Sequence, residues 1–513
     1  MGAFLAASAL AAVMNESDVV FMYAAEDSAR YGDYQANWAA WGLPWSMPSE
    51  KAVKIMRRKG VHSVGARWCL TAGARRLKED PSLAEAVCRD IEGMPIVVPW
   101  LKEQTYEGTP PWFGCTNNPR FREFVRSEVA EALAARPDGL HIDDPKGTFA
   151  TVEWGGGCFC DHCMEAFRKY LVVRETPGLL KEAGAGNFRD FDYRELVRKY
   201  AKTRQSYLGI QDKLPLREEF LDCQLRLRYE HLHEIREMAR QMCGPAATFS
   251  INAYFSEPAS TFTALVPLAT HIVCEVDHRA NEGTRKLLSV VTAYRQAEAL
   301  GRPLAATAGG HDYAWVKAHD SVNLVRIWIA LSYACGSRLM VPHPEHQWCH
   351  TEEMGTHWYA APVKPFAPMY RFVRRNPALF DGFRAVGPLA PPPGLPDEFM
   401  TGDSRRKLKE ALDTGGVPLE AAGGRAWAFP RAHPDGRLAV HVVNLDYSSG
   451  DTVNALKNFE VAIPVSLAPE RLRKITLYRF DGFARGLKAR REGESLVLAV
   501  PELPLWGVIL LDP

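Results

Sequence analysis

The sequence lacks the features that would assign it to a nucleic-acid-binding, membrane or disulfide-stabilised class. Its formal net charge is only +1 over 513 residues, so electrostatics predict neither a nucleic-acid partner nor an acidic substrate. No stretch is long and apolar enough to predict a membrane span. Eleven cysteines, an odd number in a chain of this length, do not make a disulfide framework. We therefore expect a large globular protein with no nucleic-acid partner and no membrane partner.

The first residues allow two interpretations. Residues 3–14 resemble the apolar region of a secretory signal, but no Lys or Arg precedes them. Residues 1–17 are thus either a signal-like segment or an N-terminal helical segment, and the localisation stays open between cytoplasmic and secreted or periplasmic.

From Asp18 onward, short apolar segments alternate with amphipathic ones, which predicts βα units around a parallel sheet. Eight strand candidates with intervening helices predict a (β/α)8 TIM barrel over residues 18–385, with a Cys-rich insertion at about 145–215 after the fourth strand. The expected strands are residues 19–24, 61–70, 95–101, 139–144, 247–254, 271–277, 304–308 and 338–342.

The pattern changes after the predicted barrel. Residues 386–424 read as a linker region, because they contain a Pro-rich run at 388–396. Helical periodicity is missing after about residue 425, and short apolar segments predict a C-terminal antiparallel β-sandwich domain over 425–513. A barrel followed by a β-sandwich is common among glycosidases, which favours sugar chemistry without establishing it.

Four cysteines have a spacing typical of a metal site. Cys158, Cys160 and Cys163 form a Cys-x-Cys-x-x-Cys motif, and Cys115 precedes it. Four thiolates suit a tetrahedral structural zinc better than disulfides do. Such a zinc would tie the loop after the third strand to the insertion after the fourth. The alternative is a set of buried free thiols.

Acidic residues stand where catalysis takes place in TIM barrels, at the C-terminal ends of the strands. At the end of the fourth strand, alternation puts His141 and Asp143 on one face, with Asp144 at the mouth of the barrel. In the sixth strand, Glu275 and Asp277 share a face. Carboxylates inside a barrel are costly unless they act or are paired, and Arg67 is a possible structural partner.

Two such acids across a glycosidic bond are what glycoside hydrolysis requires. We expect Asp144 to act as nucleophile or base, with Asp143 orienting it, and Glu275 to be the general acid, because its apolar flanks would raise its pKa. Asp277 is the alternative acid. A separation of about 5 Å would predict retention of configuration, and about 6.5–9.5 Å inversion.

Groups suited to a carbohydrate substrate surround these acids. Sugar hydroxyls need polar partners, and sugar ring faces need aromatic platforms, although any single Trp can equally be core. The candidate substrate-binding residues are Arg67, Trp68, Trp100, His141, Asn252, His311, Asp312, His343, Glu345 and His346.

The cysteine spacing, the run Cys115-Thr-Asn-Asn-Pro-Arg-Phe and the helical segment 164–171 together resemble the zinc site of glycoside hydrolase family 42, the β-galactosidase-like barrels. The resemblance implies a glycosidase acting on a terminal, galactoside-like sugar of an oligo- or polysaccharide, and a homo-oligomer, either trimer or dimer. The segment 138–144 also resembles the glycosyl hydrolase-like 10 proteins.

The chain departs from family 42 at the catalytic positions. Pro145 stands where the family has its strand-four catalytic Glu, and the seventh strand offers His311 and Asp312 but no Glu. Acids on strands four and six are instead similar to the arrangement in several α-glycosidase barrels, in which the strand-four Asp attacks and the strand-six acid donates a proton.

Two other functions remain open. One is a metal-dependent hydrolase that uses the histidines of the barrel mouth, although no His-x-His follows the first strand. Its ligands would come from His278, His311, His343, His346, Asp143 and Glu345. The other is a non-catalytic carbohydrate-binding barrel.

Overall fold

The computed structural model describes residues 13–25, 27–43, 47–253, 264–342, 348–351, 355–358, 363–386 and 418–513. Three predicted site residues, His343, Glu345 and His346, lie outside the described residues, as do residues 1–12 and most of the predicted linker.

Eight short strands follow one another as parallel neighbours. Six of them form one parallel sheet in chain order: β3 (Val64–Trp68), β4 (Gly139–Asp143), β5 (Thr248–Asn252), β6 (His271–Val276), β7 (Leu304–Ala308) and β8 (Arg338–Leu339). β1 (Val20–Tyr23) pairs with β2 (Trp38–Gly42), again in parallel. Single parallel bridges, Trp38 with His62 and Phe21 with Val341, connect this pair to the two edges of the sheet. The strands therefore have a closed cyclic order, and we call these eight strands the ring.

The expected strand at residues 95–101 was wrong, and one strand was missed before the expected strand at 61–70, which is present as β3. The structure has a strand at Trp38–Gly42, which the pattern did not predict because Trp-Ala-Ala-Trp-Gly contains no β-branched residue. Residues 95–101 lie instead in the connection from β3 to β4, where they end in the 3-10 helix η1 (Pro99–Leu101). Their apolar side chains pack into a second core around the cysteines. Because one strand was missed and one added, strands four to eight keep their predicted order.

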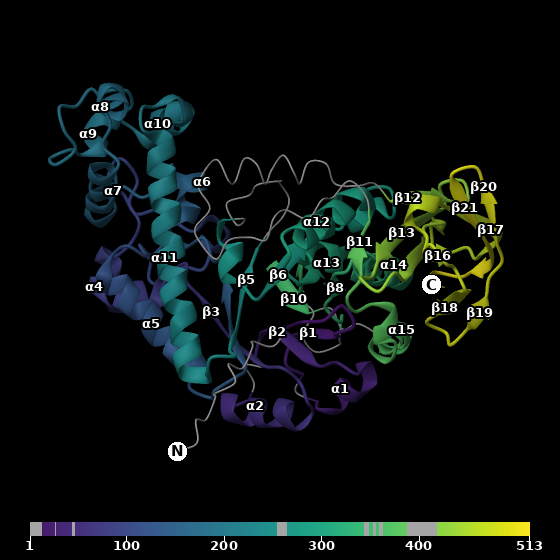
Figure 1. Cartoon of the computed structure of the whole chain (residues 1–513). Coiled ribbons are helices and arrows are strands. Elements are labelled where there is room, and N and C mark those ends of the chain that lie inside the picture. The colour runs from purple at the N-terminus through teal and green to yellow at the C-terminus, as the bar shows by residue number, and fades with distance from the viewer. Residues whose placement is uncertain are drawn as a thin grey trace, which may run out of the picture.

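Helices cover the outside of the strands (Figure 1). Asn118 caps α5 with its side chain and Pro119 follows at the first helical position, a favourable start for a helix. The helices next to the ring are α1 (Ala29–Tyr34), α2 (Ser49–Arg58), α3 (Ala74–Glu79), α4 (Pro81–Glu85), α5 (Pro119–Leu133), α11 (Arg217–Cys243), α12 (Leu287–Ala299), α13 (Gly310–His319), α14 (Val322–Ala334) and α15 (Val363–Arg375).

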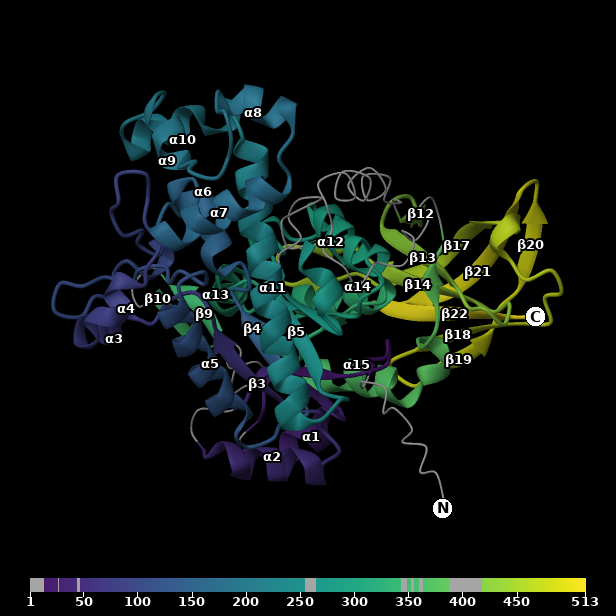
Figure 2. The ribbon, with the colours of Figure 1, turned by 60° about the vertical axis from the view of Figure 1, so that its left-hand side comes forward.

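The connection from β4 to β5 is long and mostly helical. It contains η2 (Gly147–Ala150), α6 (Thr151–Gly155), α7 (Asp161–Val173), α8 (Pro177–Ala183), α9 (Tyr193–Arg198) and α10 (Arg204–Ile210), and α11 returns the chain to the ring. Helices α8 to α10 project at one end of the molecule, as Figures 1 and 2 show. The predicted insertion of about 145–215 falls on this region.

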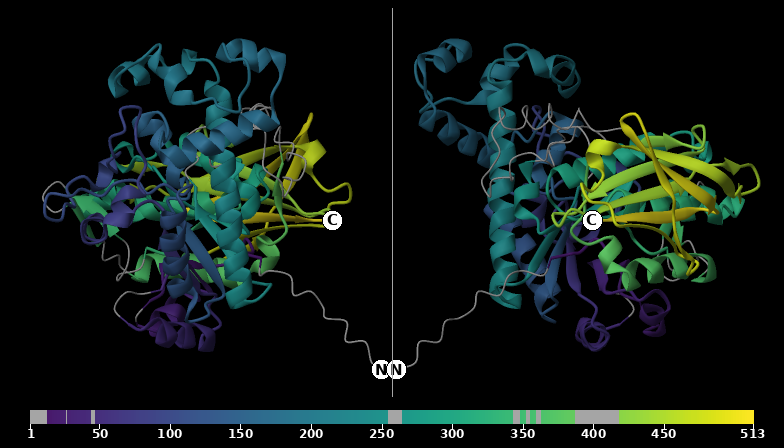
Figure 3. Two further views of the ribbon diagram at one scale, coloured as in Figure 1. Left: turned by 90° about the vertical axis from the view of Figure 1, so that its left-hand side faces the viewer. Right: turned by 45° about the vertical axis from the view of Figure 1, so that its right-hand side comes forward.

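The last part of the chain is built of antiparallel strands at the opposite end of the molecule (Figure 3). One sheet has the order β11 (Arg384–Ala385), β13 (Ala426–Ala432), β14 (Leu438–Asn444), β22 (Trp506–Asp512), β18 (Lys474–Arg479) and β19 (Ala484–Gly486), with β12 (Leu419–Ala421) beside β13. The other has the order β17 (Leu456–Pro464), β21 (Ser495–Leu503) and β20 (Ala489–Glu492). Apolar residues of both sheets share one core, so the expected antiparallel sheet domain is confirmed.

The sheet domain is joined to the helices of the ring by buried contacts. The guanidinium group of Arg431, which is 2% exposed, donates to both carboxylate oxygens of Glu298 on α12, at 3.1 and 2.8 Å. Trp506 is fully buried and stacks on Tyr333 of α14 at 6.2 Å between ring centroids. In the described part of the chain, no helix has the length and apolar character needed to cross a membrane.

Candidate active site

Asp143, the last residue of β4, is held by three N–H donors. The indole Nε1 of Trp68 donates to Oδ2 at 2.8 Å, and the Nδ2 of Asn252 and the backbone N–H of Asp144 donate to Oδ1 at 2.9 and 3.0 Å. Trp68 ends β3 and is the register neighbour of Asp143, while Asn252 ends β5. Three neighbouring strands and one backbone N–H thus fix the position of this carboxylate.

Asp144 follows in a left-handed backbone conformation, with a φ of 48°. This conformation is uncommon for residues other than glycine, although Asp tolerates it better than most. Burial first, and then the charges of Asp143 and Glu275, raise the pKa of Asp144 to about 8, although the charge of Lys146 opposes them. At neutral pH, Asp144 therefore keeps its proton.

Glu275 of β6 belongs to the same group of acids. Burial, followed by the charge of Asp143, raises the pKa of Glu275 to about 7, while His311 lowers it. Burial and the charges of Asp143 and Glu275 also raise the pKa of Tyr23, which ends β1. We call Asp143, Asp144 and Glu275 the carboxylate cluster: one fixed carboxylate beside two acids that hold their protons near neutral pH.

Asp277 does not fit the role of general acid. Burial alone would raise its pKa, but a hydrogen bond from His311 at 3.1 Å, one from the backbone of Arg279 and the charges of both residues leave the pKa lowered. Asp277 is therefore a carboxylate, paired with a His311 side chain that is 65% exposed.

Asp312 has a structural role. It is fully buried at the start of α13 and accepts hydrogen bonds from the backbone N–H groups of His278, Ala280 and Gly309 at 2.9, 2.9 and 3.2 Å. These bonds fix the turn after β6 to the start of α13. We therefore no longer place Asp312 in contact with substrate.

Arg67 and His141 have protein partners away from the carboxylate cluster. Arg67 has Ile142 as its register neighbour and lies 3.8 and 3.5 Å from Glu128 and Glu131 of α5, so it neither pairs with the barrel acids nor faces the mouth. His141 is fully buried, with its Nδ1 3.0 Å from the hydroxyl of Ser250. Burial lowers its pKa to about 4, so the imidazole is neutral.

Exposed tryptophans lie at the end of β3 and on the connections that follow β3 and β4. The exposed fractions are 47% for Trp68, 52% for Trp100 and 39% for Trp154. The rings of Trp100 and Trp154 lie 6.4 Å apart. The sequence analysis missed Trp154, which lies on α6 in the connection after β4, and gave no role to Tyr23, although Tyr23 is the last residue of β1.

The four cysteines come together as expected. Ligand atoms of Cys115, Cys158, Cys160 and Cys163 all lie within 4.8 Å of one another, and the Sγ of Cys115 is 3.5 and 3.6 Å from those of Cys160 and Cys163. These separations exceed a disulfide bond of about 2.05 Å. They approach the ~3.8 Å that Zn–S bonds of about 2.3 Å give in a tetrahedron. Asn117 also donates its Nδ2–H to the Sγ of Cys163 at 3.2 Å. The cluster could thus hold a metal ion.

In the described part of the chain, His278 and His311 do not come together as a metal-dependent hydrolase requires, and His343 and His346 lie outside it. His278 is fully buried, with its Nδ1 2.7 Å from the Val276 carbonyl and its Nε2 3.1 Å from the Tyr294 hydroxyl. Asp277, His311 and Asp312 lie close enough to share an ion, but both oxygens of Asp312 already accept backbone N–H groups.

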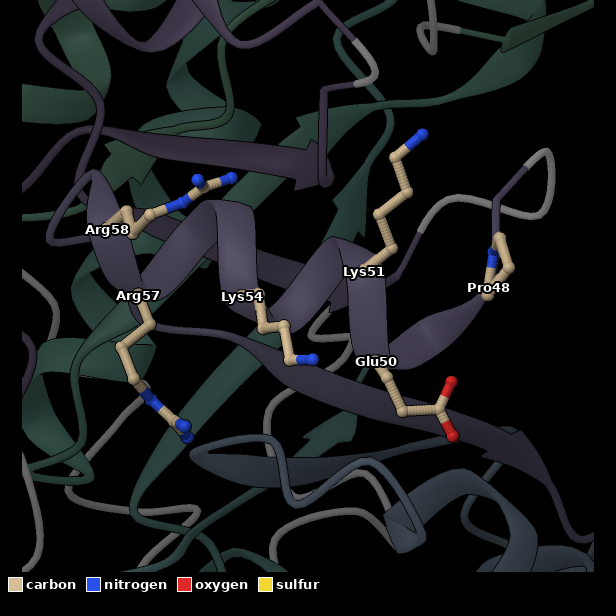
Figure 4. A pocket seen from close by; sticks show the side chains of 6 residues that line it. All are labelled: Pro48, Glu50, Lys51, Lys54, Arg57 and Arg58. Atoms are coloured by element: carbon tan, nitrogen blue, oxygen red, sulfur yellow. The ribbon is translucent and has the colours of Figure 1, made fainter.

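A surface hollow lies elsewhere, along α2 (Figure 4). It is lined by Pro48, Glu50, Lys51, Lys54, Arg57 and Arg58. None of these residues belongs to the carboxylate cluster, so we do not place the substrate there.

Comparison with known proteins relates the chain to carbohydrate-active enzymes. No protein-family model matches it, and its expected membership of glycoside hydrolase family 42 is not supported. By sequence it is similar to an α-agarase of Thalassotalea agarivorans, with 23% identity over 485 residues, covering 77% of this chain and 32% of that protein. The chain thus spans about a third of the length of this curated relative.

By structure the chain is similar to α-L-fucosidase isoenzyme 2 of Paenibacillus thiaminolyticus, with a TM-score of 0.58, 12% identity and coverage of 97% and 100% of the two chains. It is also similar to a cycloisomaltooligosaccharide glucanotransferase of Paenibacillus sp., with a TM-score of 0.55, 8% identity and coverage of 97% and 85%. The chain therefore shares its fold with these two enzymes.

Proposed function

We propose that the chain is a glycoside hydrolase with a (β/α)8 barrel that acts on a polysaccharide. The carboxylate cluster carries the proposal, because one fixed carboxylate beside protonated acids is what cleavage of a glycosidic bond requires. The similarity to α-agarases makes an agar-type galactan, with an α-linkage, the first substrate to test.

The catalytic roles that we propose differ from those expected from the sequence. Asp143 is the nucleophile, because hydrogen bonds from Trp68 and Asn252 hold its side chain in place at the end of β4. Glu275 is the general acid, because its pKa of about 7 keeps a proton available at neutral pH. Asp144 is protonated and donates a hydrogen bond to a sugar hydroxyl, since an acid with a pKa of about 8 is a poor nucleophile at that pH.

Other groups would bind the rest of the polymer. Trp68 next to the cluster and the Trp100–Trp154 pair offer exposed ring faces on which sugar rings stack, as a chain longer than one sugar requires. His311 is exposed beside Asp277 and would bind a sugar hydroxyl. A homo-oligomer, trimer or dimer, remains a prediction.

The cysteine cluster is proposed to hold a structural zinc. Replacing Cys158 by Ala should remove the metal and lower the free energy of unfolding by about 4 kcal/mol when zinc is present at a thousandfold excess over its Kd. Elemental analysis and thermal unfolding measure both effects. Cys243, half-buried at the end of α11 and outside the cluster, provides the control variant Cys243→Ser, which should keep its zinc. Metal-replete protein without zinc would contradict the proposal.

The function is tested with agarose, other galactans and a panel of aryl glycosides of both anomers. We expect cleavage of at least one α-linked galactan and, among the aryl substrates, a preference for one anomer. Binding of these sugars without any turnover would instead support the non-catalytic carbohydrate-binding barrel.

A further inference from the structure

Arg228 is a buried cation that the proposed chemistry does not use. It lies on α11 and is 1% exposed. Among the ion pairs of the described residues, none includes Arg228. Burying a guanidinium group without a carboxylate is costly, so its hydrogen bonds must compensate for the lost hydration.

These hydrogen bonds hold the loop that begins at the carboxylate cluster. The Nε–H of Arg228 donates to the carbonyl oxygen of Pro145, the residue after Asp144. Its Nη1 lies 2.9 Å from the Nδ1 of His231. Burial, together with the charge of Arg228 and two other arginines, lowers the pKa of His231 well below its usual value. The neutral imidazole can therefore accept the guanidinium N–H.

Gly147 shows how closely the guanidinium group lies against this loop. A Cβ added at Gly147 would lie 2.9 Å from Cζ of Arg228, and the residue has a φ of +51°. Both the contact and the left-handed backbone require glycine here. The backbone from Asp144 to Gly147 therefore has two left-handed residues and is fixed between them by Arg228.

A second contact holds the same loop from the cysteine segment. The backbone N–H of Thr116, the residue after Cys115, donates to the Thr148 hydroxyl at 2.6 Å, and the two hydroxyl oxygens are 2.8 Å apart. One turn before Arg228, Gln224 exchanges two hydrogen bonds with the backbone of Cys158, at 3.1 and 3.3 Å. Helix α11, which Figures 1 and 2 show beside β5, thus contacts both the cysteine segment and the loop.

We propose that Arg228 is a positioning residue: with the Thr116–Thr148 contact, it clamps residues 144–148 so that Asp144 stays half-buried beside Asp143 and Glu275. The assignment of Asp144 to the reaction rests on the proposed function. The clamp itself does not, because it is a property of the loop in the free protein.

Release of the clamp has a defined chemical consequence. Burial is the largest cause of the raised pKa of Asp144, so a loop that opens to water lowers that pKa. The charged and titratable groups that interact with Asp144 are Asp143, Glu275, Lys146 and the Cys69 thiol, and all of them stay in the variant proteins.

The test compares Arg228→Met, Arg228→Lys and Thr148→Val with the control Arg240→Met, which removes an arginine of the same helix paired with Glu237. Hydrogen exchange measured by mass spectrometry reports opening of residues 144–150 without any need for catalysis. We expect at least about tenfold faster exchange there in Arg228→Met, with partial restoration by Lys and no change in the control. Zinc content and exchange in the β-domain should stay as in the parent protein.

Activity gives the second readout. A misplaced catalytic group costs up to about 10²-fold, so we expect kcat to fall 10- to 100-fold in Arg228→Met with KM changed less than about threefold. Unchanged exchange of residues 144–150 in both Arg228→Lys and Thr148→Val would overturn the proposal, even if Arg228→Met fails to fold. Faster exchange in a protein that cleaves no glycoside would support the clamp and refute the proposed function.

Discussion

Asp143→Asn is expected to lose turnover of polysaccharide and aryl glycosides alike, by roughly 10²–10⁴-fold or more, the range expected of a primary catalytic group. The amide keeps the size of the side chain but removes the negative charge that Trp68 and Asn252 stabilise. A neutral side chain cannot attack the anomeric carbon or balance a developing positive charge there, so a good leaving group does not rescue the variant.

The same substitution has a second, electrostatic effect. The charge of Asp143 is the second cause of the raised pKa values of Asp144 and Glu275, so its removal lowers both. A matched control is Asp138→Asn, which alters a carboxylate bound to Ser63 just before the start of the same strand. That control should retain near-normal turnover. Full activity of Asp143→Asn combined with an inactive Asp144→Asn would contradict these roles. It would support Asp144 as the nucleophile or base and Asp143 as the residue that orients it, as the sequence predicted.

Glu275→Gln is expected to separate substrates by their leaving groups. Turnover of the polysaccharide should fall about 10²–10⁴-fold, because its sugar leaving group needs a proton. Aryl glycosides with acidic phenols should lose far less. The matched measurement is the ratio of kcat/KM for a nitrophenyl glycoside and for the polymer, in the parent protein and in the variant. Equal losses for both substrates would contradict the role of Glu275 as general acid.

The pH dependence of the activity follows from the ionisation of Glu275. A general acid acts only while it holds its proton, and the pKa of Glu275 is about 7. Activity on the polymer should therefore be present below about pH 7 and decline as the pH rises through that value. The alkaline limb should disappear for activated aryl substrates, which do not need the proton.

Stability should change in the opposite sense to activity. An acid whose pKa is raised on folding binds its proton more tightly in the native state, so the native state loses stability as the pH rises from about 4 toward the folded pKa. Glu275→Gln removes this penalty and should raise the thermal unfolding temperature at pH 8 more than at pH 5. A gain of equal size at both pH values would show that ionisation of Glu275 does not oppose folding.

The sequence predicted the parts of the site that depend on local periodicity. Strand alternation correctly put Asp143 and Glu275 near each other at the ends of strands four and six. The same alternation gave the wrong side for Arg67. A shift of one residue along a strand moves a side chain to the opposite face, and the expected strand 61–70 was longer than the actual Val64–Trp68. The strand Trp38–Gly42 was not predicted, because its alanines and glycine have a weak preference for strands.

The relative roles of Asp143 and Asp144 depend on contacts that sequence periodicity does not contain. The three donors of Asp143 come from two other strands and from a backbone N–H. The left-handed turn at Asp144 is fixed by a helix more than eighty residues later in the chain. The cysteine spacing, in contrast, predicted the grouping of all four thiols, because three of them lie within six residues.

The buried pair of Arg431 and Glu298 connects the ring to the sheet domain, so a protein cut or recombined at this boundary would lose a stabilising contact. A chain that ends before β13 would leave the Glu298 carboxylate without its partner, and breaking a buried ion pair costs about 3–5 kcal/mol. It would also uncover the surface of α14 on which Trp506 packs. A protein that exchanged its C-terminal sheets for another domain would have to replace these contacts at the same time. We therefore expect the two parts to be inherited as one unit.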